Sequence, residues 1–107
     1  MCYQLDIYRN SSERSKDLHP YLLVIQHDYY DDLSTRLILP ISYRRYLNGK
    51  NHPVTPLINI EFQSLFLNTP CITSVEKVKL KNKNFVCNMP SARTQIVAAI
   101  DALVTNT

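Results

Sequence analysis

Glycine, tryptophan and long apolar runs are scarce or absent in this sequence of 107 residues. Its one glycine, Gly49, follows Asn48 in a pair typical of a tight turn, and a single glycine excludes a glycine-rich phosphate-binding loop. No apolar run approaches the roughly 20 residues that a membrane-spanning helix needs. The first nine residues alternate apolar and polar side chains and include Asp6, unlike a signal peptide. We therefore expect a cytoplasmic protein without a membrane segment.

Cysteine and histidine are too few and too scattered to suggest a metal site or a disulfide framework. Cys2, Cys71 and Cys87 form no Cys-x-x-Cys pair, so we expect reduced thiols. The histidines share no metal-ligand spacing, and no Gly-x-Ser-x-Gly motif is present. His27 and Asp28 precede two more aspartates and could form an acid–base cluster, but a solvated turn is favoured. We expect no catalytic residues, no metal and no cofactor, hence a protein that is not an enzyme.

Length and composition are those of one soluble globular domain. A chain of 107 residues can form one modest core, so we expect a single domain over residues 1–107. Apolar residues make up 45% and charged residues 20%, the usual balance for such a domain. The net charge of +3 is too small to indicate direct nucleic-acid binding. We interpret the lysines of Lys77–Lys83 as a solvated face.

Alternation of apolar and polar side chains predicts β-strands through the first four-fifths of the chain. We expect strands at residues 3–8, 21–25, 36–41, 57–62, 65–67 and 74–81. The even-numbered residues of the first strand should face solvent. Pro40 should limit the third strand and place this end at an edge or a bulge, because proline cannot donate to a ladder. Residues 57–62 and 65–67 should form a hairpin with Ile58, Ile60 and Phe62 on one face. The strand at residues 74–81 should have a basic outer face.

The period of the pattern changes once, near the C-terminus. From Pro90 to Val104 the apolar residues recur at the spacing of an amphipathic helix. Asn88 is a candidate cap, and Pro90 suits a first helical turn. Several strands followed by one terminal helix predict an α+β fold built on an antiparallel sheet.

Two stretches of the sequence share their order of motifs with a known protein family. The first is PYLLVIQHD at residues 20–28, followed by TRLILPI at residues 35–41. It is similar to that family's hydrophobic strand with a Gln-Ser-Asp turn, followed by Arg-hydrophobic-Val-Ile-Pro-Leu. The second begins with TPLINI at residues 55–60 and continues through TSV at residues 73–75 to IVAAID at residues 96–101. The chain thus resembles the CcdB family of toxins. The resemblance covers nearly the whole chain, with its parts in matching order.

This resemblance implies a five-stranded antiparallel sheet with a small side sheet, SH3-like barrel character and a C-terminal helix, assembled as a homodimer. It implies a cognate antitoxin whose disordered tail wraps the dimer. The toxin–antitoxin complex would repress its own operon, so operator DNA would be bound only through that complex. The family acts by inserting between the two GyrA arms of DNA gyrase and trapping the enzyme with cleaved DNA. Such an action needs shape and anchoring side chains rather than catalytic groups.

The resemblance also suggests which residues bind each partner. In the family the last residues of the helix face gyrase. The resemblance therefore implies a gyrase-binding set of Asp101, Val104, Thr105, Asn106 and Thr107. Family antitoxin tails are acidic, so we expect the tail to dock on basic residues of the loop after the first strand and of a second basic edge. The antitoxin-binding set is Arg9, Arg14, Arg44 and Arg45.

The chain end departs from the family pattern and leaves three interpretations open. Family helices usually end in an aromatic residue, glycine and isoleucine, where this chain has Thr105, Asn106 and Thr107. Buried anchors of that kind contribute about 2 kcal/mol or more each. The favoured interpretation is a gyrase-directed toxin. The others are a non-toxic homologue that still binds an antitoxin, and an endoribonuclease like the MazF/Kid toxins, which share the fold.

Overall fold

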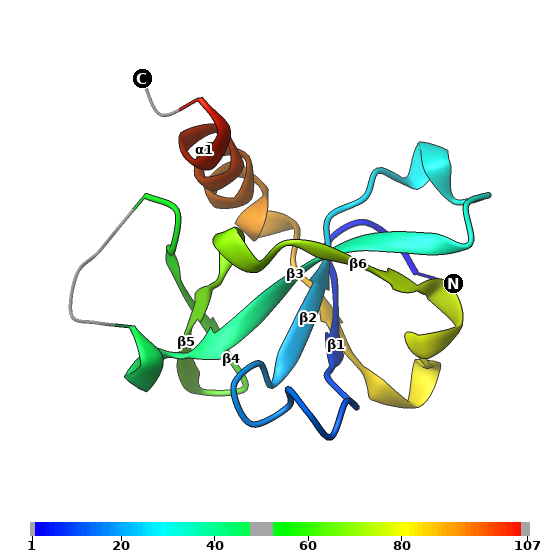
Figure 1. Ribbon diagram of the computed structural model, residues 1–107, viewed down its shortest axis with the longest axis horizontal. Coiled ribbons are helices and arrows are strands. Elements are labelled where there is room, and N and C mark those ends of the chain that lie inside the picture. Colours follow the sequence, from blue (N-terminus) through cyan, green and yellow to red (C-terminus); the bar gives the residue numbers. More distant parts are fainter. Residues whose placement is uncertain (1, 48–52, 106–107) are drawn as a thin grey trace.

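The computed structural model describes residues 2–47 and 53–105, and the predicted Asn48–Gly49 turn lies outside them. Seven strands form one curled antiparallel sheet, and a single α-helix follows at the C-terminus (Figure 1). The strands are β1 (Asp6–Arg9), β2 (Tyr21–Val24), β3 (Thr35–Tyr43), β4 (Leu57–Ile60), β5 (Gln63–Leu67), β6 (Thr73–Glu76) and β7 (Phe85–Asn88). The helix is α1 (Arg93–Val104). The predicted α+β class is confirmed, although all seven strands are connected in one sheet.

Strand β3 is the centre of the sheet and contacts three other strands. It pairs with β2 on one side, and on the other with β6 through its first half and with β5 through its last residues. Pro40 lies where β3 passes from β6 to β5, and its carbonyl accepts a hydrogen bond from the Asn68 amide at 2.9 Å. At this gap between β6 and β5, no neighbouring strand requires a hydrogen bond from the Pro40 nitrogen, which carries no proton. The strand continues to Tyr43, beyond the predicted end at Ile41, and Pro40 lies at a gap between two partner strands, where its missing donor is tolerated.

Both faces of the central strands are buried. The larger core cluster lies between the sheet and α1, and its members include Ile7, Leu23, Leu39, Leu65 and Ile96. A smaller cluster covers the other face with Tyr8, Val24, Ile38 and Leu80. The prediction of a solvent-facing side for the first strand is wrong, because Asp6 and Tyr8 are only 4% and 1% exposed.

The first strand begins later than predicted because the chain turns sharply before it. The Asp6 amide donates to the Tyr3 carbonyl at 3.0 Å, and Leu5 has a φ of 73°. The buried Asp6 carboxylate accepts from the Tyr3 amide at 2.8 Å and from Asn88 Nδ2 at 2.9 Å. Asn88 thus lies in β7, a strand not predicted, and does not cap the helix. Residues Pro90–Ala92 form a 3-10 turn, and α1 starts at Arg93.

The basic segment at residues 74–81 is only half a strand. Pairing with β3 ends at Glu76, and Lys77–Lys79 form a short 3-10 helix, η4. This turn directs Leu80 into the smaller core cluster, where it is 7% exposed. The predicted strand with a continuous basic outer face is therefore wrong in its second half. None of the described helices has the length and apolar character required to cross a membrane.

Candidate binding surfaces

The outer side of α1 is apolar and exposed. Ile96 and Ala99 are buried against the sheet, whereas Val97 and Val104 are 60% and 75% exposed. A shallow groove of about 350 Å³ runs along this outer side, lined by Val97, Ile100, Asp101, Val104 and Thr105. The apolar residues predicted for this helix therefore point in two directions, and only some of them lie in the core. The outward part is a surface that a protein partner could cover.

The structure describes three of the five predicted gyrase-binding residues. Asp101, Val104 and Thr105 lie together at the end of α1, where they line the groove. The Asp101 carbonyl accepts from the Thr105 amide at 2.8 Å and from the Thr105 hydroxyl at 2.6 Å. Asn106 and Thr107 lie outside the described residues. The last described turn of the helix is thus closed by Thr105 itself.

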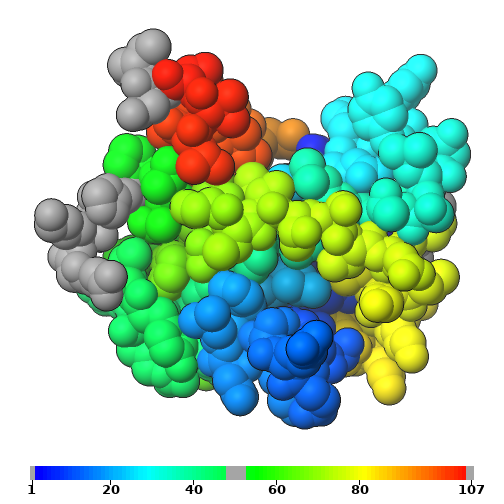
Figure 2. Space-filling model, viewed as in Figure 1, coloured from blue at the N-terminus to red at the C-terminus, as the bar shows by residue number. Residues whose placement is uncertain are grey.

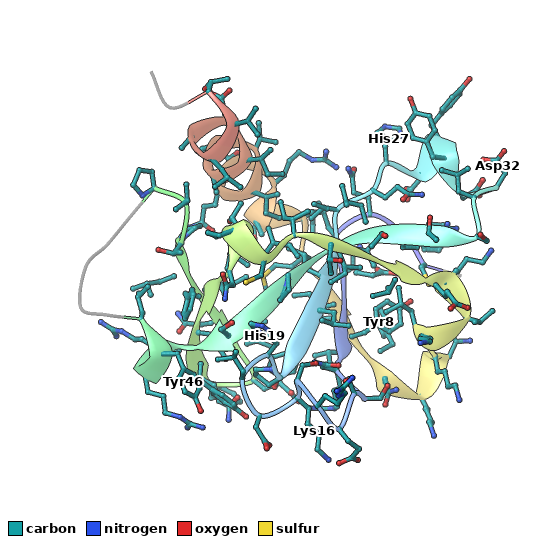
Figure 3. All side chains as sticks on the ribbon, in the orientation of Figure 1. Tyr8, Lys16, His19, His27, Asp32 and Tyr46 are labelled. Atoms are coloured by element: carbon teal, nitrogen blue, oxygen red, sulfur yellow. The ribbon has the colours of Figure 1, made fainter. Side chains whose placement is uncertain are left out.

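The predicted antitoxin-binding residues lie in two segments of the chain. Arg9 ends β1, and its Nη2 donates to Glu61 at 2.8 Å. Arg14 is exposed in the loop that follows β1. Arg44 and Arg45 are exposed in the 3-10 helix η2 (Arg44–Tyr46). Lys16 of the loop and Tyr46 of η2 lie along the same edge of the molecule (Figure 3).

The second segment is stiffened by aromatic rings. The Arg45 guanidinium lies over the Tyr43 ring at 4.5 Å and near the Tyr46 ring at 5.0 Å. Such cation–π contacts fix the arginine between two rings while leaving its charge at the surface. Arg44 has no such contact among the described residues. The two neighbouring arginines are therefore held differently, although sequence alone treats them alike.

A pocket of about 410 Å³ lies beside the loop after β1. It opens on the face shown in Figure 2, between that loop in blue and the Cys71–Leu80 segment in yellow-green. Leu22, Ile38 and Val75 contribute apolar surface to it. Its charged or titratable lining among the described residues is basic apart from the Cys71 thiol, and consists of Arg9, His19 and Lys79. An apolar pocket with a basic rim fits an acidic segment that also carries apolar side chains.

His19 is held in this pocket by a partly buried hydrogen-bond chain. Its Nδ1 lies 2.6 Å from the Ser42 hydroxyl, which accepts from Asn68 Nδ2 at 3.2 Å. Burial lowers the pKa of His19 below its ordinary value. Ser42 is fully buried, so this pair is not an exposed nucleophile with its base.

Groups that could hold a metal ion are absent from the described residues, and all three cysteines are free. Cys2 is buried, Cys71 is exposed, and burial raises the pKa of the Cys87 thiol. The His27 imidazole accepts from the Tyr29 amide at 2.9 Å and so caps a turn. The acid–base alternative for this segment therefore gains no support, because His27 is engaged with the backbone.

Comparison with known proteins identifies the family. The family model described as CcdB protein matches residues 4–106. The chain belongs to the CcdB family. No curated protein matched the chain.

CcdB proteins are toxins of toxin–antitoxin systems that target DNA gyrase, and they poison that enzyme rather than being classical enzymes themselves. The match extends from the turn before β1 through the end of α1. It therefore includes the loop, the pocket and the described part of the helix end.

One exposed surface was missed by sequence reasoning. Tyr29 and Tyr30 are 78% and 51% exposed, and their rings meet edge to face with centroids 5.1 Å apart. They belong to the 3-10 helix Asp28–Tyr30 in the segment between β2 and β3. This segment projects on the same side of the molecule as α1 (Figure 1). The adjacent tyrosines were the available signal, since tyrosine supplies much of the binding energy at protein interfaces.

A buried arginine keeps this tyrosine segment in place. Arg36 is 3% exposed, and its guanidinium donates to the carbonyls of Asp31, Leu33 and Thr35 at 2.7–2.8 Å. Gln26 adds a hydrogen bond to the Tyr30 carbonyl at 3.0 Å. A loop tied through its carbonyls presents its side chains with little entropy left to lose on binding.

Proposed function

We propose that this chain is the toxin of a type II toxin–antitoxin pair. It acts in the cytoplasm by trapping DNA gyrase in its cleaved-DNA complex, through a surface formed by the end of α1. Asp101, Val104, Thr105, Asn106 and Thr107 make the contact, and the target within DNA gyrase is GyrA. The observation that carries the proposal is the exposed apolar groove at the helix end in a chain of the CcdB family.

The segment bearing Tyr29 and Tyr30 supplies the aromatic side chains that the helix end lacks. Its rings are exposed, rigidly held and on the same side of the molecule as α1. The pair thus compensates for the absence of the family's terminal aromatic residue. Gyrase is bound by the helix end and this segment together.

The antitoxin binds the opposite side of the molecule. Its acidic tail follows Arg9, Arg14, Arg44 and Arg45 and places apolar side chains in the pocket beside His19. The chain acts as a homodimer, and the complex with the antitoxin represses the operon. Operator DNA is contacted through that complex alone, in keeping with a net charge of only +3.

A supercoiling assay with purified gyrase tests the proposal. Inhibition at micromolar chain, relieved by the antitoxin, is the expected result. A chain that binds its antitoxin but leaves supercoiling unchanged is a non-toxic regulatory homologue, which the altered chain end favours. Degradation of total RNA by the purified chain would instead indicate the MazF-like endoribonuclease.

A further inference from the structure

The turn between β4 and β5 presents an aromatic ring directly to solvent. Ile60 pairs with Gln63, so Glu61 and Phe62 are the two central residues of a tight hairpin turn. Phe62 is fully exposed, at 108% of its reference area, the largest exposure of any large apolar side chain described. It does not join Ile58 and Ile60 on the core face, which corrects the sequence prediction.

This turn has an unfavourable backbone conformation for its residues. Glu61 and Phe62 have φ values of 51° and 65°. Positive φ at both central positions suits Asn-Gly or Asp-Gly, and it is costly for a bulky residue such as phenylalanine. Strain of this kind persists where the surroundings enforce it and is concentrated at functional positions.

Contacts of the Glu61 side chain hold the turn in this conformation. Its carboxylate accepts from the Tyr21 hydroxyl at 2.6 Å and from Arg9 Nη2 at 2.8 Å. The hydrogen bond from Arg9 lowers the pKa of Glu61, and burial with the Glu61 hydrogen bond raises the pKa of Tyr21 to about 12. The clamp is therefore fully formed at neutral pH. It holds the Phe62 ring outward on a rigid support.

The turn lies between the two basic segments. Glu61 at its tip contacts Arg9, which ends β1 and lines the pocket beside His19. Strand β5 of the same hairpin pairs Leu65 with Tyr43, the residue before Arg44. A chain running from one basic segment to the other thus passes the hairpin. Because Arg9 neutralises Glu61, the tip does not repel an acidic partner.

We propose that Phe62 is an aromatic anchor for the antitoxin tail, placed between the two basic segments and held outward by the strained turn. This rests on the proposed function and names a specificity residue within it. The occupant is an acidic polypeptide with an apolar side chain that packs on the ring. The strain is retained because the turn residue that would relieve it, glycine, would remove the ring.

The test measures stability and affinity in the same variants of the full chain. The neighbouring reading frames are first searched for a short acidic protein, and a synthetic peptide with the C-terminal half of that protein is the binding probe. Phe62→Gly relieves the turn and removes the ring, so Tm should rise by about 3 °C while the dissociation constant rises at least about tenfold. Phe62→Tyr keeps the ring and is the matched control, with both values unchanged.

Three outcomes are distinguishable. Weaker peptide binding by a more stable Phe62→Gly chain supports the anchor. Wild-type affinity of Phe62→Gly, with Arg14→Glu still weakening the peptide, overturns the anchor and leaves the proposed function intact. Failure of the wild-type chain to bind the peptide at all overturns the proposed antitoxin site and the anchor with it.

Discussion

At the scale of single residues, the four arginines assigned to the antitoxin site are not equivalent. Arg9 is paired with Glu61, and Arg45 lies over two tyrosine rings. Arg14 and Arg44 make no ion pair within the described part of the chain. Exposed charges of the latter kind affect association and salt dependence more than stability.

Charge reversal should therefore separate binding from folding. Arg14→Glu and Arg44→Glu should each raise the dissociation constant of the antitoxin peptide about tenfold at low salt. The effect should be smaller at about 0.5 M salt, because screening shortens the range of the attraction. Arg9→Glu should lower Tm as well, because it breaks the clamp on the strained turn. Calorimetric titration and thermal melts measure the two effects. Unchanged affinity in all of these variants would contradict the placement of the tail.

His19 predicts a pH dependence of stability. Burial lowers its folded-state pKa below the unfolded value, so the unfolded chain binds the proton first as pH falls. Stability should thus decrease as pH falls through the window below about 6.5, from the unfolded value down to the folded pKa. His19→Gln removes this titration, so its Tm should fall less than that of the wild type between about pH 7.5 and 5.5. Parallel pH profiles for the two proteins would show that another group dominates.

At the scale of elements, the end of α1 is the part assigned to gyrase. Deleting Thr105–Thr107 should abolish growth arrest on overexpression while dimerisation and antitoxin binding persist, because those surfaces lie elsewhere. Replacing the same residues by Trp-Gly-Ile should strengthen arrest by restoring aromatic and aliphatic anchors. Colony counts under an inducible promoter measure both. Full arrest by the truncated chain would exclude the helix end as the toxic surface.

Elements with a strong local signal were predicted well. The hairpin of β4 and β5, the buried strand β2 and the helix follow from their hydrophobic periods. Hydrophobic periodicity does not predict the start of β1, the strand β7 or the end of β6, because contacts between distant segments of the chain determine them. Asp6 can be buried because Asn88 donates a hydrogen bond to its carboxylate. Leu80 lies outside β6 and packs in the smaller core cluster. Alternation alone cannot show that both faces of a strand are covered.

The assignment of the candidate binding surfaces to their partners stays a prediction. The positions of the helix end and the basic loop followed from a resemblance that covers nearly the whole chain. The ring of Tyr29 could not be placed and that of Phe62 was wrongly assigned to the core face, because the sequence does not show whether an apolar residue near a turn packs inward or is held in solvent. Here Arg36 and Glu61 decide the matter through hydrogen bonds from other segments.

At the scale of the whole molecule, the outer side of α1 remains uncovered in one chain. Val97, Leu103 and Val104 are all more than 40% exposed. We expect a symmetric homodimer that covers the part of this surface around Val97 and leaves the helix end, from Val104 onward, free on both sides of its axis. Sedimentation should give a species of about 25 kDa, twice the chain mass of 12.4 kDa, at micromolar concentration. A species of one chain mass would contradict the dimer.

Toxicity through gyrase is the central claim, and cleavage-complex formation tests it most directly. Purified gyrase, ATP and plasmid DNA are incubated with the wild-type chain, with the chain lacking Thr105–Thr107, and with Tyr29→Ala/Tyr30→Ala. Linear DNA released by detergent and protease should accumulate with the wild type, decrease severalfold with the tyrosine variant and be absent with the truncation. Linear DNA at background level with a folded, dimeric wild-type chain would contradict the account.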